Sequence, residues 1–149
     1  MNRRLAVALL ALCAFGASAA RSAAPATILP GFRSSSGNIG CLLVPGHPAT
    51  LLCHIARADY AQALQARCMA GPSVDWHGFE LTATGRGSTV CSGGILYNPD
   101  TQRPSYVTLP YGKSWRHNPF TCRSRVTGIT CRNRAGHGLF ISRASWRAW

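Results

Sequence analysis

The sequence predicts a mainly β domain, on the border of α+β, with antiparallel hairpins, one short helix and three disulfides. Three observations support this prediction. Apolar and polar residues alternate in short runs, as in residues 79–84, and turn residues such as Gly85-Arg86-Gly87 separate the runs. Apolar residues recur with clear helical spacing only in residues 59–69. The 149-residue chain also contains seven cysteines, a high number for one small domain.

The first 20 residues have the pattern of a secretory signal peptide. Two arginines precede an apolar run of eleven residues, 5–15, and small residues follow it. The run is too short to cross a bilayer, since a spanning helix needs about 20 apolar residues. We expect cleavage after Ala19 or Ala20, which also removes Cys13, and export to the periplasm or out of the cell. No transmembrane segment is expected in the mature chain.

The expected mature chain has a flexible leader, residues 21–31, and one disulfide-stapled, β-rich domain, residues 32–149. The whole chain has 16 Lys+Arg and 4 Asp+Glu. Loss of Arg3 and Arg4 leaves 14 basic residues against 4 acidic ones, a formal charge of +10. A length of about 130 residues is typical of a single domain.

Six cysteines remain after cleavage, and an even number in an exported chain predicts three disulfides. Fifteen pairings of six cysteines are possible. Zinc-knuckle spacing is absent because the chain has no C-x-x-C pair, and we expect no metal and no cofactor. The six residues are Cys41, Cys53, Cys68, Cys91, Cys122 and Cys131.

The first predicted hairpin favours one of these pairings. Strands are expected at 37–44 and 50–55, joined by a turn around His47. Cys41 and Cys53 each lie six residues from His47, so they fall opposite each other across the hairpin. Further strands are expected at 79–84, 88–92, 95–97, 106–109, 120–125, 129–133 and 139–142.

The remaining cysteines follow from a second hairpin and from the helix. A turn containing Gly128 brings Cys122 near Cys131. By elimination Cys68, on the predicted helix, pairs with Cys91 and ties the helix to the sheet. Asp59 is expected to cap the start of this helix.

Several short motifs occur in a fixed order: Phe32-Arg33-Ser34-Ser35-Ser36-Gly37-Asn38-Ile39-Gly40-Cys41, Leu109-Pro110-Tyr111-Gly112, Gly128-Ile129-Thr130-Cys131-Arg132-Asn133, and Gly136-His137-Gly138-Leu139-Phe140-Ile141-Ser142-Arg143. Together these motifs resemble an uncharacterised family of exported bacterial domains, over about residues 32–143. The resemblance implies export and a cysteine-stapled β-rich domain. It implies no activity, so no catalytic residue is assigned. The family pattern has an acidic residue shortly after Cys91, where this chain has Ser92-Gly93-Gly94.

Residues for catalysis are sparse. The four carboxylates are expected to be solvated charges and a helix cap. Five histidines would allow a ribonuclease-like mechanism, with one histidine as base, a second as acid and an arginine stabilising the phosphorane. His137 is the most suggestive, because Gly136 and Gly138 leave room for a ligand. No spacing demonstrates this mechanism, so we expect a non-enzymatic protein and keep a small secreted hydrolase as the alternative.

The distribution of charge is the best functional clue. No acidic residue follows Asp100, whereas nine basic residues do, and a strong positive field follows from this asymmetry. Arg123 and Arg125 share one face of a predicted strand, and Arg132 and Arg134 share a face of the next strand. Arginine forks bind phosphate or carboxylate, and aromatic rings offer stacking surfaces. The predicted binding residues are Arg116, Arg123, Arg125, Arg132, Arg134, His137, Arg143, Trp115 and Trp146.

The expected partner is anionic: a polymer, a lipid headgroup, cell-wall material or an acidic protein. Nucleic acid is possible but not favoured, because an exported protein meets it less often. Two alternatives stay open. The protein could be an inhibitor or immunity-type protein acting on another exported protein. The basic surface could also reflect the base composition of the gene, since arginine outnumbers lysine fifteen to one.

Overall fold

The computed structural model describes residues 25–71, 75–94 and 96–149. The expected signal peptide, its cleavage site and Cys13 lie outside these residues. Within them the chain forms eleven strands and one helix, which confirms the mainly β fold class. No helix in the described part of the chain is long and apolar enough to cross a membrane.

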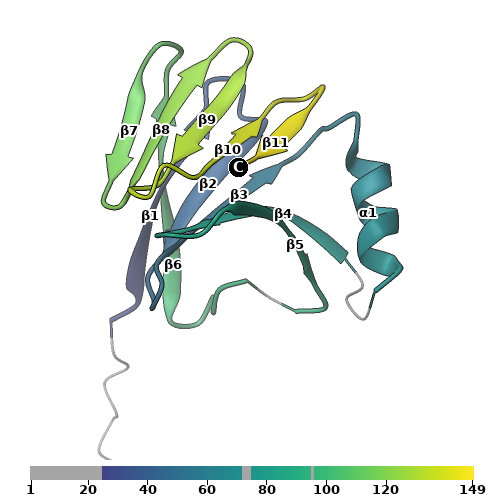
Figure 1. Cartoon of the computed structure of the whole chain (residues 1–149). Helices are drawn as coiled ribbons and strands as arrows, with labels where there is room; N and C mark the ends of the chain where they lie inside the picture. The colour runs from purple at the N-terminus through teal and green to yellow at the C-terminus, as the bar shows by residue number, and fades with distance from the viewer. Residues whose placement is uncertain (1–24, 72–74, 95) are drawn as a thin grey trace, which may run out of the picture.

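The strands form two sheets (Figure 1). Strands of the first sheet are β1 (Thr27–Ser34), β2 (Ile39–Val44), β3 (Thr50–Ile55), β4 (Asp75–Thr82), β5 (Gly87–Ser92) and β6 (Gln102–Leu109). They lie in the order β5-β4-β3-β2-β1-β6. Strands of the second sheet are β7 (Ser114–His117), β8 (Phe120–Arg125), β9 (Gly128–Arg132), β10 (Gly138–Ile141) and β11 (Trp146–Ala148). They lie in the order β11-β10-β9-β8-β7.

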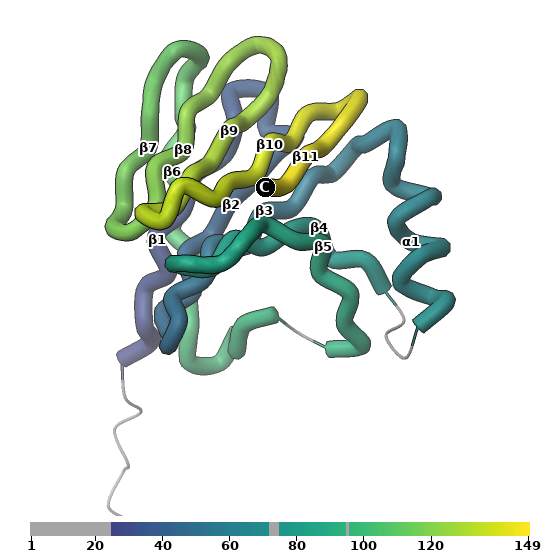
Figure 2. Tube along the Cα trace, viewed as in Figure 1, coloured from purple at the N-terminus to yellow at the C-terminus, as the bar shows by residue number. Residues whose placement is uncertain are grey.

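Part of the expected flexible leader is a strand. Residues 27–31 belong to β1, which pairs in parallel with β6 over eight positions, from Thr27 opposite Gln102 to Ser34 opposite Leu109. The two strands lie side by side at one edge of the first sheet (Figure 2). The expected strand at 106–109 is the end of β6, whereas Leu96 and Tyr97 of the strand expected at 95–97 lie outside the strands. Residue 95 lies outside the described residues.

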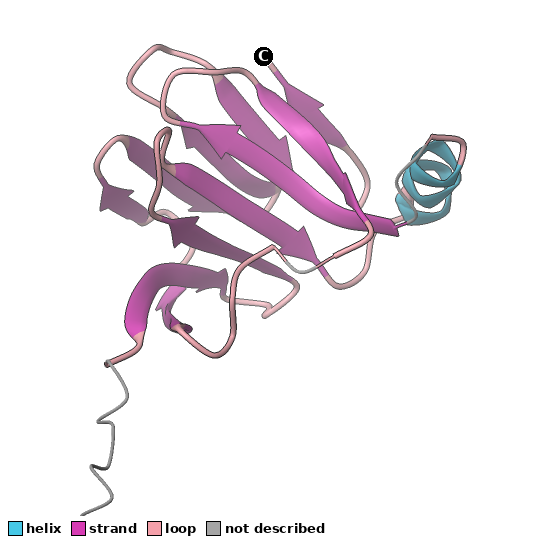
Figure 3. Ribbon diagram, turned by 90° about the horizontal axis from the view of Figure 1, so that it is seen from below, coloured by secondary structure: helices cyan, strands magenta, loops and turns pink. Residues whose placement is uncertain are grey.

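The single helix, α1 (Ala61–Met69), lies to one side of the sheets (Figure 3). Its buried face contains Leu64 and Cys68, and Cys68 forms a disulfide with Cys91 on β5. The predicted cap is wrong. Tyr60 occupies the N-cap position without a side-chain cap hydrogen bond, and the Asp59 carboxylate instead accepts a hydrogen bond from Arg143.

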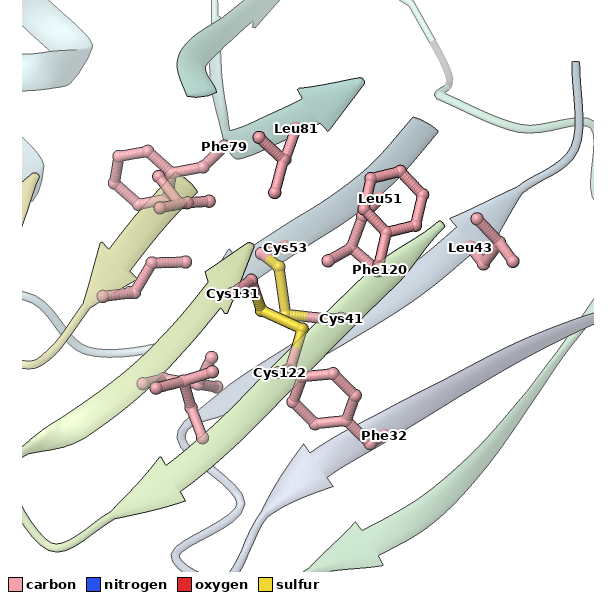
Figure 4. Packing of buried hydrophobic residues seen from close by; sticks show 14 of the residues in the cluster. Phe32, Cys41, Leu43, Leu51, Cys53, Phe79, Leu81, Phe120, Cys122 and Cys131 are labelled. Carbon is pink, nitrogen blue, oxygen red and sulfur yellow. A yellow bond between two sulfur atoms is a disulfide. The ribbon is translucent and has the colours of Figure 1, made fainter. Parts of the chain in front are cut away.

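The two sheets pack face to face around one apolar core, and two disulfides lie within it (Figure 4). Cys41–Cys53 joins β2 to β3 and Cys122–Cys131 joins β8 to β9, so all three predicted pairings are confirmed. These four cysteines are at most 2% exposed. The sulfur atoms of Cys41, Cys53 and Cys131 all lie within 4.8 Å of one another, so the bridge of one sheet touches the bridge of the other.

A buried asparagine joins the turns at the edge of this core. Asn133, 7% exposed, follows β9, and its Nδ2 donates to the carbonyl oxygens of Thr82 (2.9 Å) and Gly85 (2.8 Å) in the β4–β5 turn. Its Oδ1 accepts the backbone N–H of His137 at 3.1 Å. One side chain therefore connects a turn of the first sheet to a turn of the second.

We expect Asn133→Ala to lower the free energy of unfolding by about 2–3 kcal/mol, because three hydrogen bonds are lost and their partners are left in a partly buried site. Urea denaturation measures this change. Arg134→Ala is the matched control on the same turn. Its guanidinium makes only an exposed bond to Asn118, so its loss should cost less than about 0.5 kcal/mol. Equal losses in the two variants would show that Asn133 does not join the turns.

Candidate functional site

The outer face of the second sheet carries the arginines of the C-terminal half. Along β8, Phe120, Cys122 and Ser124 are buried, whereas the residues between and after them are exposed. Successive side chains on a strand point to opposite faces. The outward positions of β8 are therefore Thr121, Arg123 and Arg125, directly behind the buried disulfide.

Strand pairing extends this pattern into rows that cross the sheet. Arg116 on β7 and Arg132 on β9 lie on either side of Thr121. Neighbouring strands are about 4.8 Å apart, so the backbones of these two arginines are separated by roughly 10 Å. The next row contains one arginine of β8 and one of β11 among hydroxyl and aromatic side chains; in order it is Ser114, Arg123, Thr130, Phe140 and Arg147.

These rows enclose an open hollow of about 810 Å³. Its lining contains five arginines, three hydroxyl side chains and two aromatic side chains, but no acidic side chain. We call this surface the arginine face. Its residues are Ser114, Arg116, Thr121, Arg123, Arg125, Thr130, Arg132, Phe140, Arg147 and Trp149.

The C-terminal tryptophan forms one side of the arginine face. Trp149 exchanges two backbone hydrogen bonds with Gly138, at 2.9 and 3.1 Å. Its indole occupies the space that a Cβ at position 138 would need, so only glycine fits there. The guanidinium carbons of Arg132 and Arg147 lie 5.2 and 5.8 Å from an indole ring centroid, within the range of cation–π attraction.

No acidic side chain of the described residues pairs with an arginine of the arginine face. The guanidinium groups of Arg116, Arg123 and Arg125 have no hydrogen-bond or ion-pair partner among the described residues. The four acidic residues belong to the first sheet and its connections. Glu80 on β4 accepts a hydrogen bond from Ser88, and the ion pair of the described chain joins Asp59 to Arg143 at 3.2 Å. A positive potential is therefore directed outward from the second sheet.

Four predicted binding residues, Arg116, Arg123, Arg125 and Arg132, lie together on the arginine face. Three others do not line it. Arg134 lies in the turn after β9 and donates to Asn118 Oδ1 at 2.6 Å, whereas His137 lies in the same turn and is half-buried. Arg143 lies in the β10–β11 turn and pairs with Asp59.

The two predicted tryptophans point to the opposite face. Trp115 packs on Phe32, with ring centroids 5.2 Å apart, and Trp146 packs on Phe79 at 5.1 Å. Both lie next to an outward arginine in the sequence, so strand alternation turns them toward the core.

Sequence reasoning did not include Phe140, Arg147 and Trp149 in the site. The signal for the last two was their spacing of two, which places both on one face of a strand. That signal could be used only once residues 146–148 were known to form β11.

The histidines are dispersed. No histidine in the described ranges hydrogen-bonds a carboxylate or a second histidine. His77 bonds the carbonyl oxygen of Ser92, and His117 stacks on Trp115. His54 lies over Gly40 on the outer face of the first sheet, where a Cβ at position 40 would overlap its imidazole.

Desolvation perturbs three titratable groups away from the arginine face. Desolvation, and secondarily the charge of Arg33, lowers the pKa of His54. Burial, and secondarily Asp59, raises the pKa of Tyr60 to about 12. Burial, and secondarily Tyr97, raises the pKa of Tyr106, although Arg33, whose guanidinium lies 4.6 Å from the ring centroid, opposes this.

The lowered pKa of His54 predicts a loss of stability in acid. The native state binds this proton less readily than the unfolded chain, so the contribution is fully present above pH 6.5 and is lost as the pH falls through the folded pKa. We expect His54→Gln to lose less unfolding free energy than the unmodified protein between pH 7.5 and pH 5, measured by urea denaturation. Equal losses in both proteins would contradict the role of His54.

A nuclear magnetic resonance titration separates the two causes. Arg33→Gln should raise the pKa of His54 only part of the way to 6.5, because burial is the larger cause. A complete return to 6.5 would show that Arg33 dominates.

Comparison with known proteins leaves the activity open. Neither the curated proteins nor the solved structures provide a match. One family model, described as a family of unknown function (DUF6636), matches residues 6–147. Since this match covers nearly the whole chain, the protein belongs to that family.

Proposed function

We propose that this protein is exported and binds an anionic partner on the arginine face, without catalysing a reaction. The observation that carries the proposal is the grouping of five arginines around one hollow whose lining contains no acidic side chain. If the arginines only reflected the base composition of the gene, nothing would favour this grouping on one surface without acidic side chains.

The chemistry of the arginine face suits an oxyanion. A guanidinium fork donates two parallel hydrogen bonds to a phosphate, sulfate or carboxylate, and such charge-assisted bonds are roughly twice as strong as neutral ones. Ser114, Thr121 and Thr130 add hydroxyl donors between the arginines. Phe140 and Trp149 provide apolar surface for the uncharged part of a ligand.

The scaffold holds this surface in place before a ligand arrives. Arg123, Arg125 and Arg132 belong to the β8–β9 hairpin, which Cys122–Cys131 crosslinks on its buried side. A preorganised site loses less conformational entropy on binding. The backbone positions of the three arginines therefore need little rearrangement.

Two observations support export. The first 20 residues have the pattern of a cleaved signal peptide, and three disulfides are typical of proteins outside the reducing cytoplasm. The proposal places the protein in the periplasm or outside the cell, where anionic polymers, lipid headgroups and cell-wall material are accessible.

Charge removal tests the arginine face. We expect Arg116→Gln with Arg123→Gln to weaken binding to immobilised dextran sulfate and to reduce the slope of log K against log salt by about 2, because two ion contacts are lost. Arg67→Gln with Arg103→Gln is the matched control, since it removes the same charge from exposed positions on α1 and β6. Equal weakening in both double variants would mean that only net charge matters.

Mass spectrometry tests export. The protein from the extracytoplasmic fraction of its host should begin at Ala20 or Arg21. Its mass should be about 6 Da lower than that of the reduced form, because three S–S bonds replace six thiols. A chain that retains Met1 and has free thiols would contradict the proposed location.

A further inference from the structure

A second, smaller hollow of about 270 Å³ lies where five connections meet at one end of the sandwich. It is lined by the β1–β2 turn with Ser36 and Asn38, by the β8–β9 turn, and by the start of the β10–β11 turn. Arg57 and Arg125 also line it. The proposed function assigns no role to this hollow.

The two hollows share one side chain. Arg125, the last residue of β8, lines both of them. Outward residues on a strand are about 6.6–6.8 Å apart, so Thr121, Arg123 and Arg125 span roughly 13 Å of the arginine face. A continuous line of donors thus follows β8 and enters the second hollow, where Arg57 continues it.

The arginines that line the second hollow differ in whether their guanidinium groups have a partner. Asn38 holds the backbone of Arg57 through two hydrogen bonds, of 2.9 and 3.0 Å, while the Arg57 guanidinium has no partner among the described residues. Arg143 also lines the hollow but is paired with Asp59 in an exposed salt bridge. The second hollow therefore offers Arg57 and Arg125 as unpaired cations.

We infer that the partner is a flexible linear polymer bearing phosphate or sulfate groups, which lies along β8 and bends at Arg125 into the second hollow. This inference rests on the proposed function and specifies its ligand. A small anion would fill only one hollow. A rigid, convex protein surface would contact the arginine face without entering the second hollow, whereas a flexible chain can follow the line into it.

The donor set favours tetrahedral oxyanions over carboxylates. One arginine fork satisfies both oxygens of a carboxylate in a single plane. A phosphate or sulfate has additional acceptor oxygens outside that plane. Hydroxyl donors for these oxygens are available at both hollows. On the arginine face, Thr121 lies between Arg116 and Arg132. At the second hollow the hydroxyl groups are those of Thr127 and Ser36.

Binding at both hollows makes affinity depend on chain length. Once one segment is bound to the arginine face, the next segment reaches the second hollow at a high effective concentration. A long chain therefore gains the contact with Arg57, and a short chain bound on the face does not.

Calorimetry with the full mature chain tests this inference, with tripolyphosphate as the short probe and long-chain polyphosphate as the long one. Arg57→Gln should weaken binding of the long probe by about three- to tenfold and change binding of tripolyphosphate less than about twofold. Arg116→Gln should weaken both, because Arg116 lies on the arginine face. Arg103→Gln, which removes the same charge from β6, is the control for net charge.

The outcomes separate the inference from the proposed function. The linear path is wrong if Arg57→Gln weakens binding of the long probe no more than Arg103→Gln does. It is also wrong if the two probes bind the unmodified protein with equal affinity per chain. In both cases the arginine face stays the binding site. If neither polyphosphate probe nor dextran sulfate binds the unmodified protein, the proposed function falls as well. Where the long probe binds, the same variants measured with dextran sulfate identify the oxyanion. If Arg57→Gln weakens binding of both polymers, either oxyanion is accepted; if it weakens binding of polyphosphate alone, the ligand carries phosphate.

Discussion

The contact between two cross-strand disulfides at the centre of the sandwich is the constraint on which the rest of the structure depends. Cys41–Cys53 fixes the register of β2 against β3, and Cys122–Cys131 fixes β8 against β9. Each closes a short loop and contributes about 3 kcal/mol by restricting the unfolded chain. These bridges point inward and touch each other. In each hairpin, the residues that alternate in step with the cysteines must therefore also point toward the core. A shift of one residue in β8 would expose Cys122 and bury Arg123, which would cost a buried unpaired charge.

The arginine face is a consequence of this arrangement. The core needs only one side of the second sheet, so the outward positions of β7, β8, β9 and β11 carry no packing role. Arginine occupies five of these positions while the apolar residues between them, such as Ile129 and Leu139, stay buried. The disulfide behind the face fixes the backbone, and only the arginine side chains have freedom left to lose when a ligand binds. Stability and the proposed binding therefore depend on opposite sides of the same strands.

Features that depend on residues close together in the sequence were predicted correctly. The disulfide Cys41–Cys53 follows from equal distances to a turn, and the shared face of Arg123 and Arg125 follows from alternation within one strand. The parallel pairing of β1 with β6 was missed because its partners lie 75 positions apart. Both strands also contain a proline, Pro30 and Pro104, which weakens a strand signal but is tolerated at or near a sheet edge. The tryptophans were assigned to the wrong face for a related reason: their orientation depends on where β7 and β11 begin, and those short strands depend on the neighbours with which they pair.

Net charge alone does not specify a binding surface, and the position of the acidic residues is the more informative observation. The formal charge of +12 would act over the whole surface if acids and bases were mixed. In this protein Glu80 and Asp75 lie on β4 of the first sheet, so the second sheet presents the excess positive charge by itself. At physiological salt the Debye length is about 8 Å, so more distant charges are largely screened and a ligand is attracted mainly by the charges nearest to it. An anion near the second sheet is therefore attracted to rows of unpaired guanidiniums, whereas one near the first sheet meets both signs. The fold thereby converts an overall excess of arginine into one oriented surface.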